Sequence, residues 1–301
     1  MTEDRRADTN GSAQSSGGGT SSGTEAEFAA EFAAVEAELD KRWPESVIEP
    51  SLDRIAALVD ALGDPQRAYP VVHIAGTNGK TSVARMVDAL LTEAGLRVGR
   101  YTSPHLQRVT ERISLDGEPI SPARYVEVYQ EIRPYIELVD ARRAEGQPVL
   151  SKFEVLTAMA FAAFADAPVD AAVVETGLGG RWDATNVADG TVSVITPVGV
   201  DHQEYLGSDL AGIAAEKAGI IKPGSITVLA AQEPEVAAVL LARCAEVGAT
   251  VAKPFADAMG INGLIVLTGL LCVVAGCTVV LLGYTERRHA ATAGQRASAV
   301  P

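Results

Sequence analysis

The chain has 301 residues, 47% of them hydrophobic, and can bury a sizeable core in one large domain or two smaller ones. Its formal net charge of −14 argues against binding to nucleic acid or to anionic lipid, because an acidic surface is repelled by both. Three cysteines, Cys244, Cys272 and Cys277, are too few and too badly spaced for a disulfide framework or a zinc site. Because the N-terminus also lacks an apolar signal segment, we expect a reducing, cytoplasmic location.

The first elements expected along the chain are a tail and two helices. Residues 1–23 are predicted to form a disordered tail, because their Ser, Gly and Thr side chains bury too little apolar surface to offset ordering entropy. Thr24 and Glu27 have the spacing of a capping box, which predicts that the first helix begins there. A second helix is expected over 52–62, ending at Gly63.

Strand and helix signals then alternate. Short apolar runs predict strands at 69–75, 98–101, 171–175, 192–195 and 226–230. Helical spacing and end signals predict helices at 80–94, from Pro122, at 153–165, at 210–218 and at 233–247. Asp116 and Gly117 predict a hairpin turn. The alternation predicts an α/β fold, with a mostly parallel sheet, helices on both faces and ligands at the carboxyl ends of the strands.

The character of the sequence changes near its end. No charged residue occurs over 258–285, and 264–282 is almost wholly apolar, which is long enough to span a membrane. Arg287 and Arg288 follow, so we expect a C-terminal apolar transmembrane helix over 258–285 and a disordered tail over 286–301. A buried core helix is the alternative.

A glycine-rich turn between the first strand and the next helix carries the strongest chemical signal. Its glycines let backbone N–H groups point inward, the helix N-terminus adds a positive dipole end, and Lys80 adds a full charge. Ile74 stands where the general phosphate loop has glycine, so the match is to a shorter variant. A turn that binds no phosphate is the alternative. The residues expected to hold a nucleotide are Gly76, Thr77, Asn78, Gly79, Lys80, Thr81 and Ser82.

Other polar residues also follow strands. Glu175 ends an apolar strand and is a natural magnesium ligand, since Mg²⁺ prefers hard oxygen donors. His202 taken alone is more often structural than a ligand, and Ser103 taken alone belongs to a turn. Lys217 would ordinarily be a surface lysine near a helix end, but a lysine that has taken up carbon dioxide as a carbamate is an oxygen donor.

Six stretches, taken in chain order, resemble the folylpolyglutamate synthase/dihydrofolate synthase family of the Mur ligase superfamily. They are GTNGKTS, YTSPHL, SKFE, ETGLGGRWDATN, TPVGVDH and EKAGI. The resemblance covers about residues 26–251 and implies a Mur-ligase-type, phosphate-loop-containing ATP-binding domain over 24–253, with ATP and Mg²⁺ as cofactors. Two of the stretches, TSPHL and ETGLGGRWDATN, are similar to the folate branch in particular.

The resemblance also implies roles for individual residues. Lys80, His202 and Lys217 are implied to be catalytic, and Ser103, Glu175, His202 and carbamylated Lys217 to bind Mg²⁺. Three stretches are implied to bind the pteridine: Glu49, Pro50 and Ser51; Ser151, Lys152, Phe153 and Glu154; and Trp182, Asp183 and Ala184.

The activity implied by the resemblance is that of a carbon–nitrogen ligase, adding L-glutamate to dihydropteroate or to a folate through an acyl phosphate, in a monomeric protein. Family members continue into a second α/β domain that closes over ATP, whereas this sequence continues into the apolar segment. We therefore expect a truncated, incomplete ligase. The alternatives are another Mur-type amino acid ligase, or a truncated or fused membrane-attached protein that binds ATP or a pterin without turnover.

Overall fold

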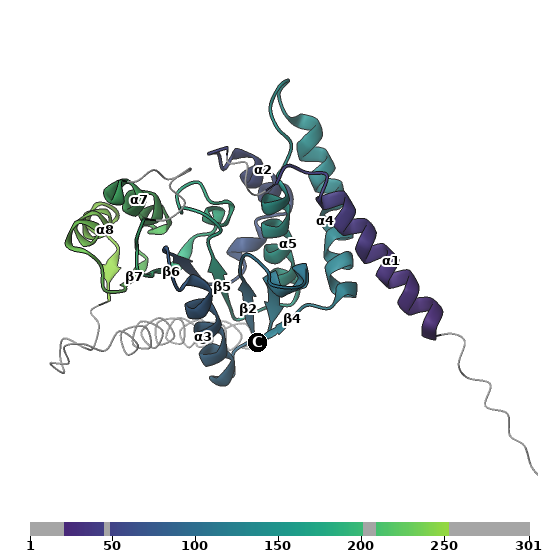
Figure 1. Ribbon diagram of the computed structural model, residues 1–301, viewed down its shortest axis with the longest axis horizontal. Coiled ribbons are helices and arrows are strands. Elements are labelled where there is room, and N and C mark those ends of the chain that lie inside the picture. The colour runs from purple at the N-terminus through teal and green to yellow at the C-terminus, as the bar shows by residue number, and fades with distance from the viewer. Residues whose placement is uncertain (1–20, 45–48, 201–208, 253–301) are drawn as a thin grey trace, which may run out of the picture.

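A computed structural model describes residues 21–44, 49–200 and 209–252, and it is built around an eight-stranded sheet (Figure 1). The strand order is β4-β3-β2-β5-β1-β6-β7-β8. The strands are β1 (Val71–Ala75), β2 (Val98–Tyr101), β3 (Ile113–Leu115), β4 (Glu118–Pro119), β5 (Ala171–Glu175), β6 (Gly190–Ile195), β7 (Ile226–Leu229) and β8 (Thr250–Val251). The strands from β2 to β8 in this order pair in parallel, whereas β3 and β4 form an antiparallel edge.

Helices cover both faces of the sheet, as the alternation of elements predicts (Figure 1). They are α1 (Ser21–Leu39), α2 (Asp53–Ala61), α3 (Lys80–Glu93), α4 (Pro122–Arg142), α5 (Lys152–Asp166), α7 (Leu210–Lys217) and α8 (Pro234–Val247). Strand β1 shows how the layers are divided, because its side chains alternate between faces. Val71 packs with α1, α2, α4 and α5, whereas Val72 and Ile74 pack with α3. Ala75 packs in a third cluster with α7 and α8.

The antiparallel edge confirms the predicted hairpin turn. Asp116 and Gly117 have φ angles of 51° and 87°, the left-handed conformation that a tight hairpin turn demands at both central residues. Leu115 and Glu118 pair across the turn. The Asp116 carboxylate accepts a hydrogen bond of 3.0 Å from the N–H of Val98, which ties the hairpin to β2.

The start of the first helix differs from the expectation. Helix α1 begins at Ser21, so Thr24 lies inside the helix and does not cap it, and the predicted tail over 1–23 extends too far. Several hydroxyl-bearing residues precede the apolar stripe, and each favours a helix start, so the sequence pattern does not choose among them.

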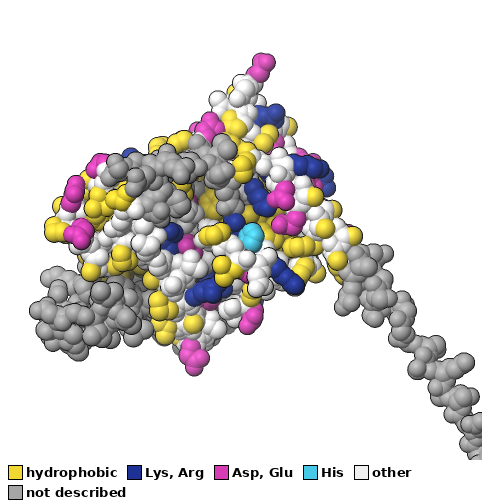
Figure 2. Space-filling model, viewed as in Figure 1, with side chains coloured by type: hydrophobic (Ala, Val, Ile, Leu, Met, Phe, Trp, Pro, Cys, Tyr) yellow, Lys and Arg dark blue, Asp and Glu magenta, His cyan; other side chains and the backbone are white. Residues whose placement is uncertain are grey.

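The C-terminal predictions are untested. The expected transmembrane helix over 258–285 and the expected tail over 286–301 lie outside the described residues and stay predictions, as does most of the predicted N-terminal tail. None of the helices that the structure describes is both long and apolar enough to cross a membrane. On the face shown in Figure 2, basic side chains are interspersed with acidic and hydrophobic ones, so the charge there is mixed in sign.

Candidate functional site

The glycine-rich turn lies at the carboxyl end of β1, in the middle of the sheet. A Cβ atom at Gly76 would lie 1.8 Å from Thr196 Oγ1, so only glycine permits this approach to the segment after β6. Gly79 has a φ of 83° and caps α3, and a Cβ atom there would meet nothing within 4 Å. The turn is therefore closely packed on the side of β6, whereas no described residue other than its chain neighbours lies within 4 Å of a Cβ atom at Gly79, at the helix N-terminus where an anion can approach the helix dipole.

Two members of the turn act as anchors. The N–H groups of Thr77 and Asn78 both donate to the Pro197 carbonyl oxygen, at 3.1 and 3.3 Å. The Thr77 hydroxyl donates to the Gly199 carbonyl oxygen at 2.9 Å. The donors at an α-helix N-terminus that have no partner inside the helix are those of its first turn. In this structure an anion would consequently be held by the start of α3 more than by the N–H groups of Thr77 and Asn78.

Lys80 folds back over the turn. Its ammonium group donates to the carbonyl oxygens of Gly76 and Thr77, at 3.2 and 3.4 Å. Both acceptors are neutral, so these contacts leave the positive charge available to an anionic ligand. Lys80 thus has the position and charge that the sequence predicts for contact with a phosphate group.

Glu175, at the end of β5, is the most unusual ionisable group of the site. Its side chain is buried, and Oε1 accepts a hydrogen bond of 2.8 Å from Thr81 Oγ1. Burial raises the pKa of Glu175 to about 7, although hydrogen bonds from Thr81 and from the Ser103 N–H and the charge of Lys80 oppose that rise. The second oxygen, Oε2, is buried and has no hydrogen-bond partner among the described residues. An orphaned carboxylate oxygen of this kind suits a Mg²⁺ ion, which prefers hard oxygen donors.

Strand order explains why these residues meet. The strands β2, β5 and β1 are neighbours, and they end at Tyr101, Glu175 and Ala75. In a parallel sheet the carboxyl ends share one edge, where ligands bind. The segments that follow β2 and β1 therefore bring Ser103 and Thr81 to Glu175, and Ser103 is itself buried.

The other predicted metal ligands are placed only in part. Lys217 ends α7 and is 4% exposed, so the alternative of a surface lysine is wrong. The backbone of Gly180 packs against it, because a Cβ atom at Gly180 would lie 2.9 Å from Lys217 Cα. His202 lies outside the described residues. Among the residues that are described, no three His, Cys, Asp or Glu side chains are grouped to hold a metal ion, so the predicted ligand set stays a prediction.

One of the predicted pteridine-binding stretches packs against the loop that carries another. Phe153, at the start of α5, packs against Gly177, since a Cβ atom at Gly177 would lie 2.6 Å from the Phe153 ring. Trp182 is half exposed, whereas Asp183 is buried. The structure thus places α5 beside the loop after β5, with the indole ring of Trp182 accessible to a ligand.

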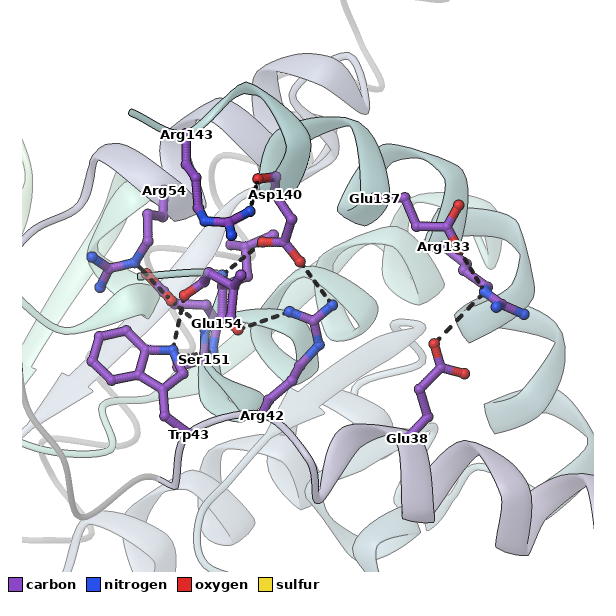
Figure 3. Close-up of polar contacts among 12 residues, drawn as sticks. Glu38, Arg42, Trp43, Arg54, Arg133, Glu137, Asp140, Arg143, Ser151 and Glu154 are labelled. Carbon is purple, nitrogen blue, oxygen red and sulfur yellow. Dashed lines mark hydrogen bonds and ion pairs between the residues drawn. The ribbon is translucent and has the colours of Figure 1, made fainter. Parts of the chain in front are cut away.

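The remaining predicted stretch is joined to α5 through Arg54, whose contact with Glu154 is drawn in Figure 3. The Arg54 guanidinium donates to both carboxylate oxygens of Glu154, at 3.1 and 3.2 Å, and to Glu49 Oε2 at 3.2 Å. It also lies 4.9 Å from the centre of the Trp43 ring, as a cation–π contact. Ser151 and Glu154 cap α5 reciprocally, so Glu154 has a structural task as well as a place in this cluster.

Sequence reasoning missed Arg54 and Trp43. Arg54 is 100 residues from Glu154 in the chain, so no local pattern links the two. The available signal was weak: a single basic side chain on α2, a helix whose buried residues are all apolar. Lys152 was predicted as a substrate contact, and in the structure its ammonium pairs with Asp40 at 2.6 Å.

A parallel sheet whose carboxyl edge combines a glycine-rich turn, a lysine at a helix N-terminus and a buried carboxylate defines an α/β protein of the phosphate-loop type. No family model matches the chain. The chain is 57% identical over 255 residues to the dihydrofolate synthase/folylpolyglutamate synthase of Mycobacterium tuberculosis, covering 81% of this chain and 52% of that relative. It therefore spans about half the length of that relative.

Solved structures give the same result. The fold is similar to Mycobacterium tuberculosis folylpolyglutamate synthase complexed with ADP and AMPPCP, with a TM-score of 0.70 at 59% identity, covering 75% of this chain and 50% of that one. It is also similar to a folylpolyglutamate synthase in complex with AMPPCP and folate, with a TM-score of 0.75 at 32% identity, covering 85% of this chain and 68% of that one. The chain belongs to the folylpolyglutamate synthase/dihydrofolate synthase family, and its fold is the Mur-ligase-type α/β fold expected from the sequence.

The raised pKa of Glu175 predicts how stability depends on pH when a chelator removes metal ions. The folded-state pKa of about 7 lies above the usual 4.5, so the folded state holds the Glu175 proton more tightly than the unfolded chain does. The free energy of unfolding is therefore highest below pH 4.5, and it falls as the pH rises through 7. Glu175→Gln removes this loss. The free energy of unfolding of the variant minus that of wild type should therefore be larger at pH 8 than at pH 5, by at most about 3 kcal/mol.

Urea unfolding at the two pH values measures this difference. Glu93→Gln, which replaces an exposed glutamate on α3, is the matched control. A stability difference between Glu175→Gln and wild type that is the same at pH 5 and pH 8 would contradict the assignment of a proton to Glu175.

Proposed function

We propose that this chain is a Mg²⁺- and ATP-dependent carbon–nitrogen ligase that adds L-glutamate to dihydropteroate or to a folate. The observation that carries the proposal is the buried Glu175 carboxylate, which accepts hydrogen bonds from Thr81 and from the Ser103 N–H beside the glycine-rich turn. Relatives from Mycobacterium tuberculosis and Bacillus subtilis are named dihydrofolate synthase/folylpolyglutamate synthase, and solved relatives hold ADP, AMPPCP or folate. The chain matches only part of each relative's length, so its substrates and activity are proposals, and turnover by this chain would contradict the expectation of an incomplete ligase drawn from the sequence.

The proposed reaction has two steps. In the first, an oxygen of the substrate carboxylate attacks the γ-phosphorus of ATP, ADP leaves, and an acyl phosphate forms. In the second, the amine of L-glutamate attacks the acyl carbon, the C–O bond to phosphate breaks, and the nitrogen loses a proton to give the amide. Phosphoryl transfer depends on positioning and electrostatic stabilisation more than on covalent protein chemistry. The protein therefore needs donors and charges at fixed places, which is what the site provides.

The residues of the chain divide this work. The start of α3 and Lys80 would hold the phosphates, and Lys80 would stabilise the negative charge that builds up on the transferring group. Mg²⁺, held by Glu175, Ser103, His202 and carbamylated Lys217, would supply Lewis-acid stabilisation of that charge. Glu175 is preorganised for this role because Thr81 and the Ser103 N–H already orient its carboxylate.

The pterin is proposed to bind where the three predicted stretches lie. Trp182 offers an exposed aromatic face, and Phe153 lines the loop beside it. The carboxylates of Glu49 and Glu154 both contact the Arg54 guanidinium and so orient it. A ligand that replaces one of these contacts would meet a charged and already oriented donor. Such a site combines an apolar face with few polar groups, as small-molecule sites usually do.

The proposal is tested by supplying the 301-residue chain with ATP, Mg²⁺, L-glutamate and either dihydropteroate or tetrahydrofolate. We expect ADP release that requires both the pterin and glutamate, with a product heavier by one glutamyl residue. Mass spectrometry of the product and a coupled ADP assay measure the two outcomes. Absence of a glutamylated pterin, or ADP release that needs another acid, would favour a different Mur-type ligase.

Replacement of Lys80 tests the nucleotide site separately from turnover. Lys80→Ala removes the charge nearest the turn, so the affinity for MgATP should fall about tenfold or more, as expected for the loss of a charge-assisted contact. Calorimetry on the full chain measures the affinity. Lys41→Ala, at an exposed lysine, is the charge-matched control, and equal MgATP affinity in all three proteins would refute the assignment.

The carbamate at Lys217 is a separate prediction. The side chain is buried at the end of α7, where an anionic oxygen would attract Mg²⁺ and an ammonium ion would oppose it. We expect a crystal structure, with bicarbonate and Mg²⁺ present, to show Lys217 carrying a carboxyl group directed at the metal. Lys222 in the same crystal is the internal control. An unmodified Lys217 side chain turned away from the metal would exclude it from the site.

A further inference from the structure

A buried hydrogen-bonded chain joins β1 to the loop over 177–186, and the roles proposed above use neither its His73 nor its Thr185. His73 is wholly buried in β1, three residues before Gly76. Its Nε2 lies 2.8 Å from Thr185 Oγ1, and the Thr185 hydroxyl hydrogen bonds to Asp183 Oδ1. We call these three residues the His73 relay. They connect the strand that leads into the phosphate-binding turn with the loop that carries Trp182.

The Asp183 carboxylate organises the loop from inside. Its Oδ1 accepts the N–H of Thr185 at 3.0 Å, and its Oδ2 accepts the N–H of Leu178 at 2.9 Å. The Gly177 N–H is a further donor to this carboxylate. Burial raises the pKa of Asp183, and these donors oppose the rise. Each carboxylate oxygen of Asp183 therefore accepts a hydrogen bond from a backbone N–H group of the loop.

The protons of the relay then have one consistent arrangement. The Thr185 hydroxyl donates its single hydrogen to Asp183 Oδ1, so its oxygen accepts a hydrogen bond from His73 Nε2–H. Burial, reinforced by the charge of Lys222, lowers the pKa of His73 to about 3, so the ring stays neutral. Its Nδ1 is buried, and no residue in the described part of the chain hydrogen bonds to it. The neutral ring therefore donates one hydrogen bond, from Nε2–H to Thr185 of the loop.

A second anchor holds the other side of the same loop. The N–H of Arg181 donates to the Glu216 carbonyl oxygen at 2.8 Å, and the N–H of Trp182 donates to Glu216 Oε1 at 3.2 Å. Glu216 precedes Lys217 at the end of α7. The loop is thus fixed between β1, which leads to the nucleotide turn, and α7, which ends at the proposed metal-binding lysine.

We propose that His73 is a positioning residue for the pterin-binding loop, acting through Thr185 and Asp183 to set the orientation of Trp182 relative to the phosphate-binding turn. The proposal rests on the proposed function for its substrate. It also assigns Asp183 to the scaffold of the loop, since both of its oxygens are taken by donors of the loop itself. The nucleotide turn is anchored separately, at Pro197 and Gly199, so the relay acts on the pterin and not on ATP.

The test compares His73→Gln with His73→Leu. The amide nitrogen of glutamine reaches about as far as the imidazole Nε2 and can donate to Thr185, whereas leucine has similar bulk and no donor. The chain has two tryptophans, so Trp43→Phe leaves Trp182 as the only one, and all variants are made in that background. In the folded, ligand-free protein, His73→Leu should shift the Trp182 emission and increase its quenching by acrylamide. His73→Gln should match the parent.

Steady-state kinetics give the second measurement. His73→Leu should raise KM for the pterin substrate about tenfold, with KM for ATP changed less than about twofold, because a small misplacement of a binding group has effects of this size. His73→Gln should restore the parent value. A role confined to global stability would lower the melting temperature of His73→Leu and leave both the emission and the ratio of the two KM values unchanged, and that result overturns the proposal.

Two further comparisons distinguish a failure of this proposal from a failure to fold and from a failure of the proposed function. If His73→Leu does not fold, Thr185→Val removes the relay with little change of volume, and Thr185→Ser is its control. If the parent makes no glutamylated pterin, the proposed function fails, and the emission and quenching of Trp182 still decide the relay. Emission and quenching that do not differ between Thr185→Val and Thr185→Ser would overturn it.

Discussion

The burial of one carboxylate, that of Glu175, governs the design of the site. Placing an ionised group away from water is costly unless donors or a cation compensate, and the cost is seen here as a pKa near 7. Thr81 and the Ser103 N–H compensate only in part, since no described residue hydrogen bonds to Oε2. A site of this kind is suboptimal for stability and well arranged for a divalent cation, which is the usual compromise at functional positions.

That compromise is possible because of the sheet order. β5 lies between β2 and β1, so Glu175 ends the strand between those that lead to Ser103 and to the glycine-rich turn. The turn can pass close to β6 only because Gly76 has no side chain to meet Thr196. Packing of apolar residues on both faces of β1 and β5 fixes the positions of the strand ends. The hydrophobic core therefore determines where the polar groups at those ends lie.

Features that depend on neighbouring residues could be predicted from the sequence. The strand ends, the hairpin at Asp116 and the helix that starts at Lys80 follow from local patterns of apolar spacing and turn residues. The Arg54–Glu154 pair and the His73–Thr185 contact could not be predicted, because their partners are 100 and 112 residues apart and meet only in the folded chain. Lys217 is instructive, because a lysine at a helix end resembles a surface residue until the fold buries it.

The two loops of the site are stabilised by different means, and this difference explains their sequences. The turn at 76–79 is held largely by backbone groups that any residue could supply, apart from the Thr77 hydroxyl and the space that Gly76 leaves free. The loop over 177–186 depends instead on particular side chains, because the Asp183 and Glu216 carboxylates accept its N–H groups. Its Gly180 lies against the backbone of Glu216 and Lys217, where a Cβ atom would come within 2.7 Å of the Glu216 carbonyl oxygen. A loop that depends on particular side chains tolerates fewer substitutions than a turn that is held by backbone contacts, so more residues of the segment after Glu175 than of the nucleotide turn are fixed by the structure.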